Sequence, residues 1–272
     1  MESRLYVAVN LGLIEEVQTL LQAHLNVNVN WAHEDNHGWT ALHLAASKGD
    51  TELVKRLLAH AAINVNGQDP FGHTPLSFSC SSGRISVVQV LLEDPRVDVV
   101  LPNDDNCTPL WLASYKGHER VIEWLIASGR DLGDLSRKGR AWEDGQKYTA
   151  LEIAQQYMWT VTVTLLERFM ANPERTQYEV RVKLGVLDEV AAEVFALTVF
   201  VCDDLLQLKP ALTSLASPSP TTVSALRFFS MTMKLPMELQ MILCHRVLGS
   251  AKQNILHKNS EPAFKALARI LL

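Results

Sequence analysis

The chain has 272 residues and a mass of 30.4 kDa; 47% of its residues are hydrophobic and 20% are charged. This composition excludes a disordered or low-complexity chain, because enough apolar surface is available for burial to offset the entropy of folding. The net charge of −5 gives no global basic field that would predict nucleic-acid binding. Residues 1–174 carry 14 basic and 22 acidic side chains (−8), whereas residues 175–272 carry 11 and 8 (+3). The change of sign predicts two parts.

The N-terminus and the cysteines indicate a compartment. The first ten residues, MESRLYVAVN, lack the apolar run of a signal peptide, and the most apolar internal stretch, 190–202, is too short to span a bilayer. The four cysteines are scattered without a C-x-x-C pair, which is typical of reduced thiols in a core. We therefore expect a cytoplasmic protein, with a nuclear location also open, and no membrane partner.

Self-similar blocks recur along the first part of the chain. The blocks LYVAVNLG, LHLAASKG, LSFSCSSG, LWLASYKG and the weaker LEIAQQYM begin at leucines that are 37, 34, 34 and 41 residues apart. Each block is followed by a second amphipathic run, such as TELVKRLLAH at 51–60, whose apolar residues have helical spacing. Each unit therefore predicts a short helix, a turn and a second helix.

A turn segment precedes the second, third and fourth blocks. These segments read DNHGWTAL, DPFGHTPL and NDDNCTPL. A residue that tolerates the left-handed conformation is available in each turn, at Gly38, Gly72 and Asn106. The threonine of each segment is placed to cap the helix that follows, and proline fits the first helical turn because its missing N–H is harmless there.

These residues resemble the ankyrin repeat, whose motif T-P-L-H-x-A-A matches TALHLAA at 40–46 with one substitution. The resemblance covers about residues 4–170. It implies an all-α ankyrin-repeat solenoid of about five helix-turn-helix repeats with short hairpin fingers. His43 matches the motif histidine, which is structural in that family, and Trp111 takes the same position. Both residues are therefore expected to be structural.

Two departures from the repeat pattern concern its last unit. The connection Arg130–Lys147 makes the last step seven residues longer than the two before it. Its cluster Arg137, Lys138 and Arg140, with Trp142, is interpreted either as a protruding contact or as a solvated irregular loop. The fifth block has Met158 where the others end in glycine. It is therefore expected to be a terminal repeat that packs on the remaining part of the chain.

The second part, 175–272, is expected to be a helical domain that caps the repeats, so the predicted domains are 1–174 and 175–272. The apolar stretch 176–208 is long enough for two helices broken at Gly185, and 212–222 (LTSLASPSPTT) has the composition of a connection. Further helices are predicted at 223–234, at 235–248 and after Pro262.

The segment LPMELQMI at 235–242 resembles the start of an F-box, L-P-x-E-L-x-x-I, which docks on the ubiquitin-ligase adaptor Skp. A weaker similarity connects 239–246 to a SOCS box. The arrangement of repeats and tail is also similar to that of a class of fungal ankyrin proteins. The alternative is a helical cap without a recruiting role, because proline followed by glutamate is ordinary at a helix start.

Motifs of the familiar enzyme classes are absent from the sequence. It contains no G-x-x-x-x-G-K-[ST], G-x-G-x-x-G, G-x-S-x-G or H-E-x-x-H. His33 and His37, with Glu34 and Asp35 between them, lack the spacing of a defined metal site. We therefore expect no enzymatic activity, no cofactor and no metal ion.

Stacked repeats present their finger tips and the exposed ends of their first helices to partners. In this register we predict a partner-binding surface at Asn36, His37, Trp39, Lys48, Phe71, His73, Asp104, Asp105, Tyr115, Lys116 and Tyr148. Its aromatic residues are expected to form a contact stripe, because aromatic rings are enriched among residues that dominate binding energy. The predicted function is non-enzymatic binding of an unidentified protein on the concave surface. The alternative is an F-box-like substrate receptor of a ubiquitin ligase, with the adaptor-binding helix at 235–248.

Overall fold

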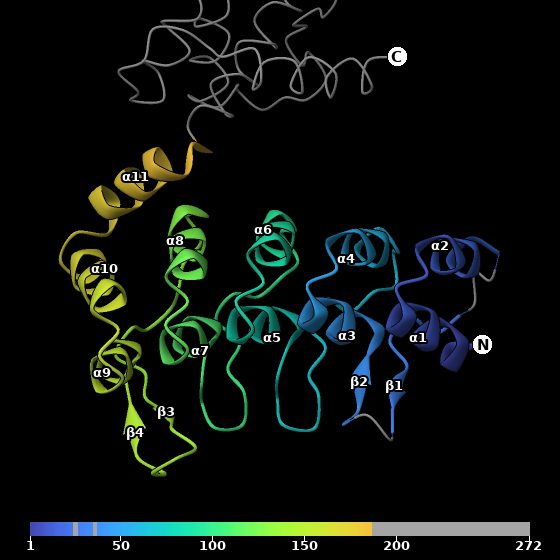
Figure 1. Ribbon diagram of the computed structural model, residues 1–272, viewed down its shortest axis with the longest axis horizontal. Helices are drawn as coiled ribbons and strands as arrows, with labels where there is room; N and C mark the ends of the chain where they lie inside the picture. Colours follow the sequence, from blue (N-terminus) through green and yellow to red (C-terminus); the bar gives the residue numbers. More distant parts are fainter. Residues whose placement is uncertain (24–26, 35–36, 187–272) are drawn as a thin grey trace, which may run out of the picture. The chain divides into compact units, whose positions relative to one another are not determined.

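The computed structural model describes residues 1–23, 27–34 and 37–186 (Figure 1). The chain divides into two compact units, Met1–Tyr178 and Glu179–Leu272. The helices predicted at 223–234, at 235–248 and after Pro262, and the connection at 212–222, lie outside the described residues. The fold below is therefore that of the first unit.

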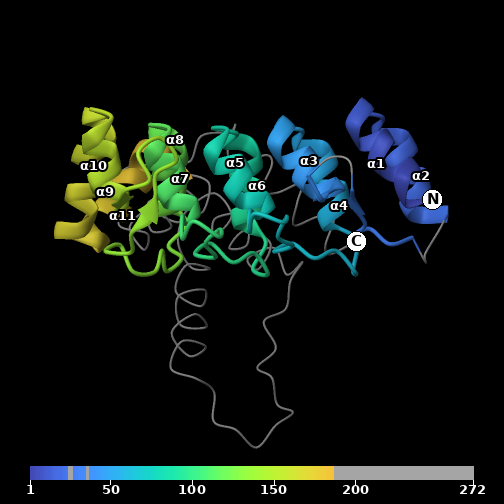
Figure 2. The ribbon, with the colours of Figure 1, turned by 90° about the horizontal axis from the view of Figure 1, so that it is seen from below.

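The first unit is built from pairs of helices in two layers. One layer consists of α1 (Glu2–Leu11), α3 (Ala41–Lys48), α5 (Pro75–Ser81), α7 (Pro109–Tyr115) and α9 (Ala150–Gln156). The other consists of α2 (Ile14–Ala23), α4 (Thr51–Leu58), α6 (Ile85–Glu93), α8 (Glu119–Ala127) and α10 (Thr160–Ala171). Within each layer, neighbouring helices are in contact, so the pairs lie side by side in chain order (Figures 1 and 2). The mostly helical prediction is confirmed for the described residues.

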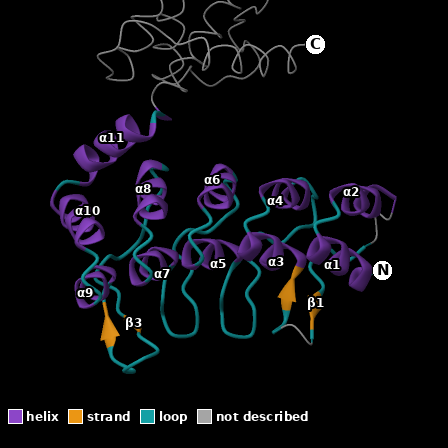
Figure 3. Cartoon of the chain, in the orientation of Figure 1, coloured by secondary structure: helices purple, strands orange, loops and turns teal. Residues whose placement is uncertain are grey.

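The connections between successive pairs extend from the α1–α9 layer, on the side away from the second helices (Figure 3). We call them finger 1 (32–40), finger 2 (66–74), finger 3 (100–108) and finger 4 (139–148). In finger 1, β1 (Ala32–His33) pairs with β2 (Trp39–Thr40) in antiparallel register. In finger 4, β3 (Gly139–Arg140) pairs with β4 (Lys147–Tyr148), with Arg140 opposite Lys147.

A threonine caps each helix that follows a finger, as predicted for Thr40, Thr74 and Thr108 and found also at Thr149. In each case the side-chain oxygen accepts a hydrogen bond from the backbone N–H three residues further on. Each such cap satisfies one of the unpaired donors at a helix start, which is worth about 1 kcal/mol.

The finger turns have the left-handed residues that the sequence predicts. Gly38, Gly72 and Asn106 have φ values of 67°, 78° and 62°. At Gly72 a Cβ atom would lie 2.7 Å from the backbone nitrogen of Asp104, so glycine is also needed for the close approach of finger 3. Met158, which replaces the helix-ending glycine of the other repeats, adopts the same conformation at φ 56°.

The core lies between the two helix layers and consists mainly of aliphatic side chains. In α4, Leu53, Val54 and Leu57 are fully buried, whereas Lys55 is exposed, as the amphipathic spacing predicts. Further buried residues of this layer boundary are Leu42, Leu76, Leu91, Leu112, Ile122, Leu125 and Ile153. Truncating one of these leucines to alanine would cost about 2–5 kcal/mol.

Hydrogen bonds tie the first helix of one pair to the finger of the next. The ring of His43 lies 3.0 Å, through Nε2, from the backbone oxygen of His73. Its Nδ1 accepts from the backbone N–H of Thr40 at 3.2 Å, so Nε2 carries the proton and donates it. Trp111, at the same position of its repeat, donates from Nε1 to the backbone oxygen of Tyr148 at 2.8 Å. The structural roles expected for His43 and Trp111 are confirmed.

The long connection from Arg130 to Lys147 is not an irregular loop throughout, because its second half forms the β3–β4 hairpin of finger 4. At its start, the guanidinium of Arg130 donates to the backbone oxygens of Asp94 and Pro95 at 3.2 and 3.3 Å. The backbone oxygen of Lys138 accepts from the side chain of Asn106 at 2.8 Å. The connection is therefore fixed to the preceding part of the chain at its start and near its middle.

The last described helix, α11 (Pro173–Leu184), begins before the boundary between the two compact units and extends past it. Gly185 follows it at φ 77°, in agreement with the break predicted there. The remainder of the apolar stretch 176–208 lies outside the described residues from 187 onward.

Gly139→Ala should destabilise the fold, because a Cβ atom at this position would lie 2.7 Å from Sγ of Cys107 and 3.1 Å from the ring of Trp111. Overpacking of this kind costs about 1–3 kcal/mol, measurable by urea unfolding. Gly67→Ala is the matched control, because the nearest atom to a Cβ there is 3.5 Å away. Equal stabilities of the two variants would contradict the packing of finger 4 on finger 3.

The stability contributed by His43 should fall in acid. Burial lowers the pKa of this imidazole below its usual value, so the unfolded chain binds the proton more readily than the folded one. The contribution is therefore present above the unfolded pKa of about 6.5 and is lost as the pH falls through the folded pKa. The difference in unfolding free energy between wild type and His43→Gln should shrink from pH 7.5 to pH 5. A difference that stays constant over this range would contradict the lowered pKa of His43.

Candidate partner-binding site

The predicted residues of finger 1 lie at its tip and along its second strand. His37 is exposed and has a left-handed φ of 54°. The ring of Trp39 is half-buried against Phe78 of α5, with the ring centroids 4.4 Å apart. Asn36 lies outside the described residues. Trp39 therefore serves mainly to pack finger 1 on the next pair.

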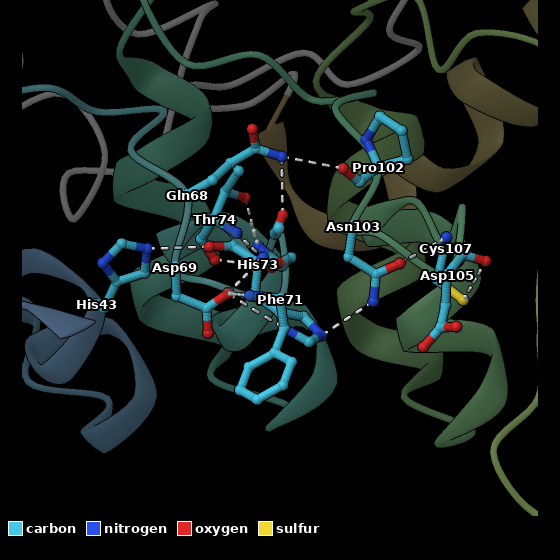
Figure 4. Close-up of polar contacts among 12 residues, drawn as sticks. His43, Gln68, Asp69, Phe71, His73, Thr74, Pro102, Asn103, Asp105 and Cys107 are labelled. Carbon is cyan, nitrogen blue, oxygen red and sulfur yellow. Dashed lines mark hydrogen bonds and ion pairs between the residues drawn. The ribbon is translucent and has the colours of Figure 1, made fainter. Parts of the chain in front are cut away.

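Fingers 2 and 3 are joined by a polar network (Figure 4). The carboxylate of Asp69 accepts from the backbone N–H of Phe71 at 3.0 Å and of His73 at 2.8 Å. The side-chain nitrogen of Asn103 lies 3.0 Å from Nε2 of His73, while its oxygen accepts from the backbone N–H of Cys107 at 2.8 Å. Asn103 is thus the donor to His73. The His73 side chain therefore helps to hold fingers 2 and 3 together, whereas the sequence predicts that it contacts a partner.

The tips of these two fingers remain accessible. The side chain of Phe71 is 57% exposed, and its backbone oxygen accepts from the N–H of Asp104 at 3.1 Å. Asp104 is exposed and Asp105 is half-buried. The backbone oxygen of Asp105 accepts from the N–H of Arg140 at 2.9 Å, so finger 4 continues the row. Phe71, Asp104 and Asp105 therefore lie along one continuous edge.

The two predicted lysines lie at the opposite ends of their helices, where the first helix turns into the second. Lys48 is exposed, and its ammonium donates to the backbone oxygen of Asn10 and, at 2.7 Å, to its side-chain oxygen. The ammonium of Lys116 lies 4.5 Å from the ring centroid of Tyr115, in the position of a cation–π contact. Both lysines therefore contact the scaffold through their ammonium groups.

Tyr115 is only 6% exposed, which differs from the expected place in an exposed aromatic stripe. Its ring stacks on Trp111 at 5.4 Å and meets Trp142 edge-on at 5.3 Å and Tyr157 at 5.2 Å. Tyr148 is half-buried, and its hydroxyl donates to the carboxylate of Asp144 at 2.7 Å. The four predicted aromatics are therefore in four different environments and do not form one stripe.

Exposed aromatic and apolar side chains instead gather around Tyr115. Trp142 of finger 4 is 46% exposed, and Met158 and Trp159 between α9 and α10 are 81% and 41% exposed. The indole of Trp159 donates to the backbone oxygen of Tyr115 at 3.2 Å, and Tyr157 is half-buried beside it. We call Trp142, Tyr157, Met158 and Trp159 the aromatic patch.

A carboxylate lies at the edge of the aromatic patch. The hydroxyl of Tyr115 donates to Glu143, and this bond lowers the pKa of Glu143 below its usual value. Burial, together with the same carboxylate, raises the pKa of Tyr115. The indole N–H of Trp142 donates to the carboxylate of Asp105 at 2.9 Å. The patch is therefore held in place by hydrogen bonds from its own rings.

An open cleft of about 460 Å³ lies on the other flank of finger 4. Its lining is polar and consists of Lys138, Lys147, Tyr148, Glu152, Gln155 and Gln156. Lys138 forms an ion pair with Glu152 at 3.1 Å, and Glu152 also accepts from the backbone N–H of Thr149 at 2.8 Å. The charges of Lys138 and Glu152 in the cleft therefore neutralise each other.

The described residues contain no metal-binding cluster and no ionised thiol. No group of three or more His, Cys, Asp or Glu side chains there is arranged to hold a metal ion. Burial raises the pKa of the Cys107 thiol to about 12 and also raises that of Cys80, so both are protonated at neutral pH. In the same part of the chain, no helix is long and apolar enough to cross a bilayer.

Sequence reasoning did not assign Glu143, Met158 and Trp159 to the binding surface. The signal for Met158 was its position, because a large side chain replaces the glycine that ends the corresponding helix of other repeats. Trp142 was recognised as a feature of the insertion but was not placed beside Tyr115. Their proximity follows from contacts between residues 27 to 44 positions apart, which no local pattern contains.

Helix pairs stacked in two layers, with fingers on one side, define a helical repeat protein. Residues 5–103 and 61–138 match the family model of ankyrin repeats (3 copies), which supports an ankyrin-repeat protein. Ankyrin repeats are generally protein–protein interaction modules, and proteins built from them are typically non-enzymatic. No curated protein matches the chain. The F-box-like segment at 235–248 lies outside the described residues.

Tyr115→Phe should raise the pKa of Glu143 toward its usual value, because the variant lacks the hydroxyl that stabilises the charged carboxylate. The pKa is measured by NMR titration of the labelled side-chain carboxyl group. Tyr148→Phe is the matched control: it should raise the pKa of Asp144, whose pKa is lowered by the Tyr148 hydroxyl, and leave that of Glu143 in place. An unchanged pKa of Glu143 in Tyr115→Phe would contradict the hydrogen bond from the Tyr115 hydroxyl to Glu143.

Proposed function

We propose that the protein is a non-enzymatic binding module that captures a partner protein on its concave face, formed by the fingers and the first-layer helices. The observation that supports this proposal is the aromatic patch at the end of that face, where Trp142, Met158 and Trp159 are 41–81% exposed. Tryptophan and tyrosine are enriched among the residues that dominate binding energy, and methionine is enriched at protein interfaces. The patch is therefore the anchor, and the remaining surface supplies complementarity.

The rigidity of the patch favours this function. Each exposed ring is held by a hydrogen bond that its own N–H donates: Trp142 to Asp105 and Trp159 to the backbone of Tyr115. A Cβ atom on Gly117 would lie 2.5 Å from the ring of Trp159, so the indole rests directly on the turn after α7. Side chains that are ordered before binding lose less entropy when a partner arrives.

The test is a double truncation, Trp142→Ala with Met158→Ser, in the full-length chain. It removes two exposed side chains of the patch without opening the core between the helix layers. We expect at least a roughly tenfold loss of partner recovery, because anchor residues are worth about 2 kcal/mol or more. Recovery is measured by quantitative affinity capture from cells that express the protein.

Met170→Ser is the matched control, because Met170 is 48% exposed on α10 in the second helix layer, away from the fingers. Proteins that are retained by this variant and lost by the double truncation are the predicted partners. An unchanged thermal midpoint of each variant shows that the fold is intact. Identical sets of proteins captured by wild type and the double truncation would refute the site.

A further inference from the structure

The edge below the aromatic patch carries negative charge beside its exposed rings. Asp104 and Asp105 at the tip of finger 3 and Glu143 and Asp144 at the tip of finger 4 lie next to Phe71 and Trp142. None of these four carboxylates forms an ion pair within the described part of the chain. Among the described residues, no cation in direct contact therefore neutralises their charge.

Neutral groups hold three of these carboxylates in position. Asp105 accepts from the indole of Trp142, Glu143 from the hydroxyl of Tyr115, and Asp144 from the hydroxyl of Tyr148. A hydrogen bond from a neutral donor favours the ionised form and leaves its full charge in place. Accordingly, the pKa values of Glu143 and Asp144 are lowered by these bonds, and both groups are ionised at neutral pH.

Basic residues also lie in this region. The guanidinium of Arg137 donates to the side-chain oxygen of Asn106 at 3.5 Å, and the backbone N–H of Arg140 donates to the backbone oxygen of Asp105 at 2.9 Å. Arg140 and Lys147 face each other on the strands of finger 4, roughly 7–10 Å along the strand from its tip. Lys138 is paired with Glu152 on the flank of the hairpin. Lys116 adds one positive charge near Glu143, where its ammonium also contacts the ring of Tyr115. Within the described part of the chain, none of these cations is therefore paired directly with the four carboxylates.

We infer that the partner segment that rests on the aromatic patch is basic, with an arginine or lysine placed against Trp142 and the carboxylates of Asp105 and Glu143, and with apolar neighbours on Met158 and Trp159. This inference rests on the proposed function and specifies the chemistry of its partner. An exposed indole face attracts a cation through its quadrupole, and arginine also stacks on it. Carboxylates already oriented beside that ring provide the complementary charge.

The test compares two short synthetic peptides on the full-length chain. They share the same apolar residues and differ only at the intervening positions, which are arginine in one and glutamate in the other. Binding is followed by fluorescence anisotropy at low and high salt. We expect the arginine peptide to bind roughly tenfold more tightly than the glutamate peptide, and high salt to reduce this preference because the charges are exposed.

The acidic character of the whole repeat region would also favour a basic peptide, so the variants must separate this general effect from the local one. Asp105→Asn with Glu143→Gln removes two charges at the tips while keeping an oxygen that accepts each hydrogen bond. Glu15→Gln with Glu93→Gln removes the same charge from exposed positions on α2 and at the end of α6. We expect the preference for the arginine peptide to fall roughly fivefold in Asp105→Asn with Glu143→Gln, and to stay unchanged in Glu15→Gln with Glu93→Gln.

Each outcome decides the inference. It is supported by a preference for the arginine peptide that the tip variant loses and the control variant keeps. It is overturned if the two double variants behave alike, if the glutamate peptide binds as well, or if neither peptide binds. If Trp142→Ala weakens the binding of both peptides equally and no charge preference exists, the basic partner is refuted and the proposed site stands. If Trp142→Ala weakens the binding of neither peptide, the proposed site is refuted as well.

Discussion

The hydrogen bond from the first helix of one pair to the finger of the next is the interaction on which the remaining structure depends. A finger with two-residue strands cannot hold its own conformation, because an isolated short hairpin is at best marginally stable. His43 fixes finger 2 through the backbone oxygen of His73, and Trp111 fixes finger 4 through that of Tyr148. Fingers 2 and 4 are thus each tied to the helix before them, whereas finger 3 is tied to finger 2 through Asn103 and the backbone N–H of Asp104.

The residue that makes this bond also determines what the neighbouring surface contains. His43 is small enough to leave Phe78 beside it, and the two rings meet edge-on at 5.9 Å. Trp111 is larger, and its ring becomes the floor on which Tyr115 stacks. Tyr115 in turn supports Trp142. The Trp111 ring therefore supports, through Tyr115, the part of the aromatic patch that Trp142 forms.

Local chemistry explains which features could be predicted from the sequence. Threonine caps, left-handed turn residues and the histidine of the repeat motif depend on a few neighbouring residues, so their spacing identified them. The burial of Tyr115 depends on Glu143, 28 residues away, and the order of finger 4 depends on the contact of Gly139 with Cys107. These contacts form only after the repeats stack. The predicted stripe of aromatics therefore differed from the observed patch, which combines finger 4 with the turn between α9 and α10.

The same stacking explains why charge and rings occur together at the tips of fingers 3 and 4. A buried tyrosine needs an acceptor for its hydroxyl, and a partly exposed tryptophan is more stable when its N–H is paired. Glu143 accepts from the hydroxyl of Tyr115 and Asp105 accepts from the indole N–H of Trp142, and both carboxylates keep their charge. Satisfying the donors of an aromatic cluster with carboxylates thus produces an oriented negative edge. A cationic partner could use this edge without reorganising it, because folding has already ordered its side chains.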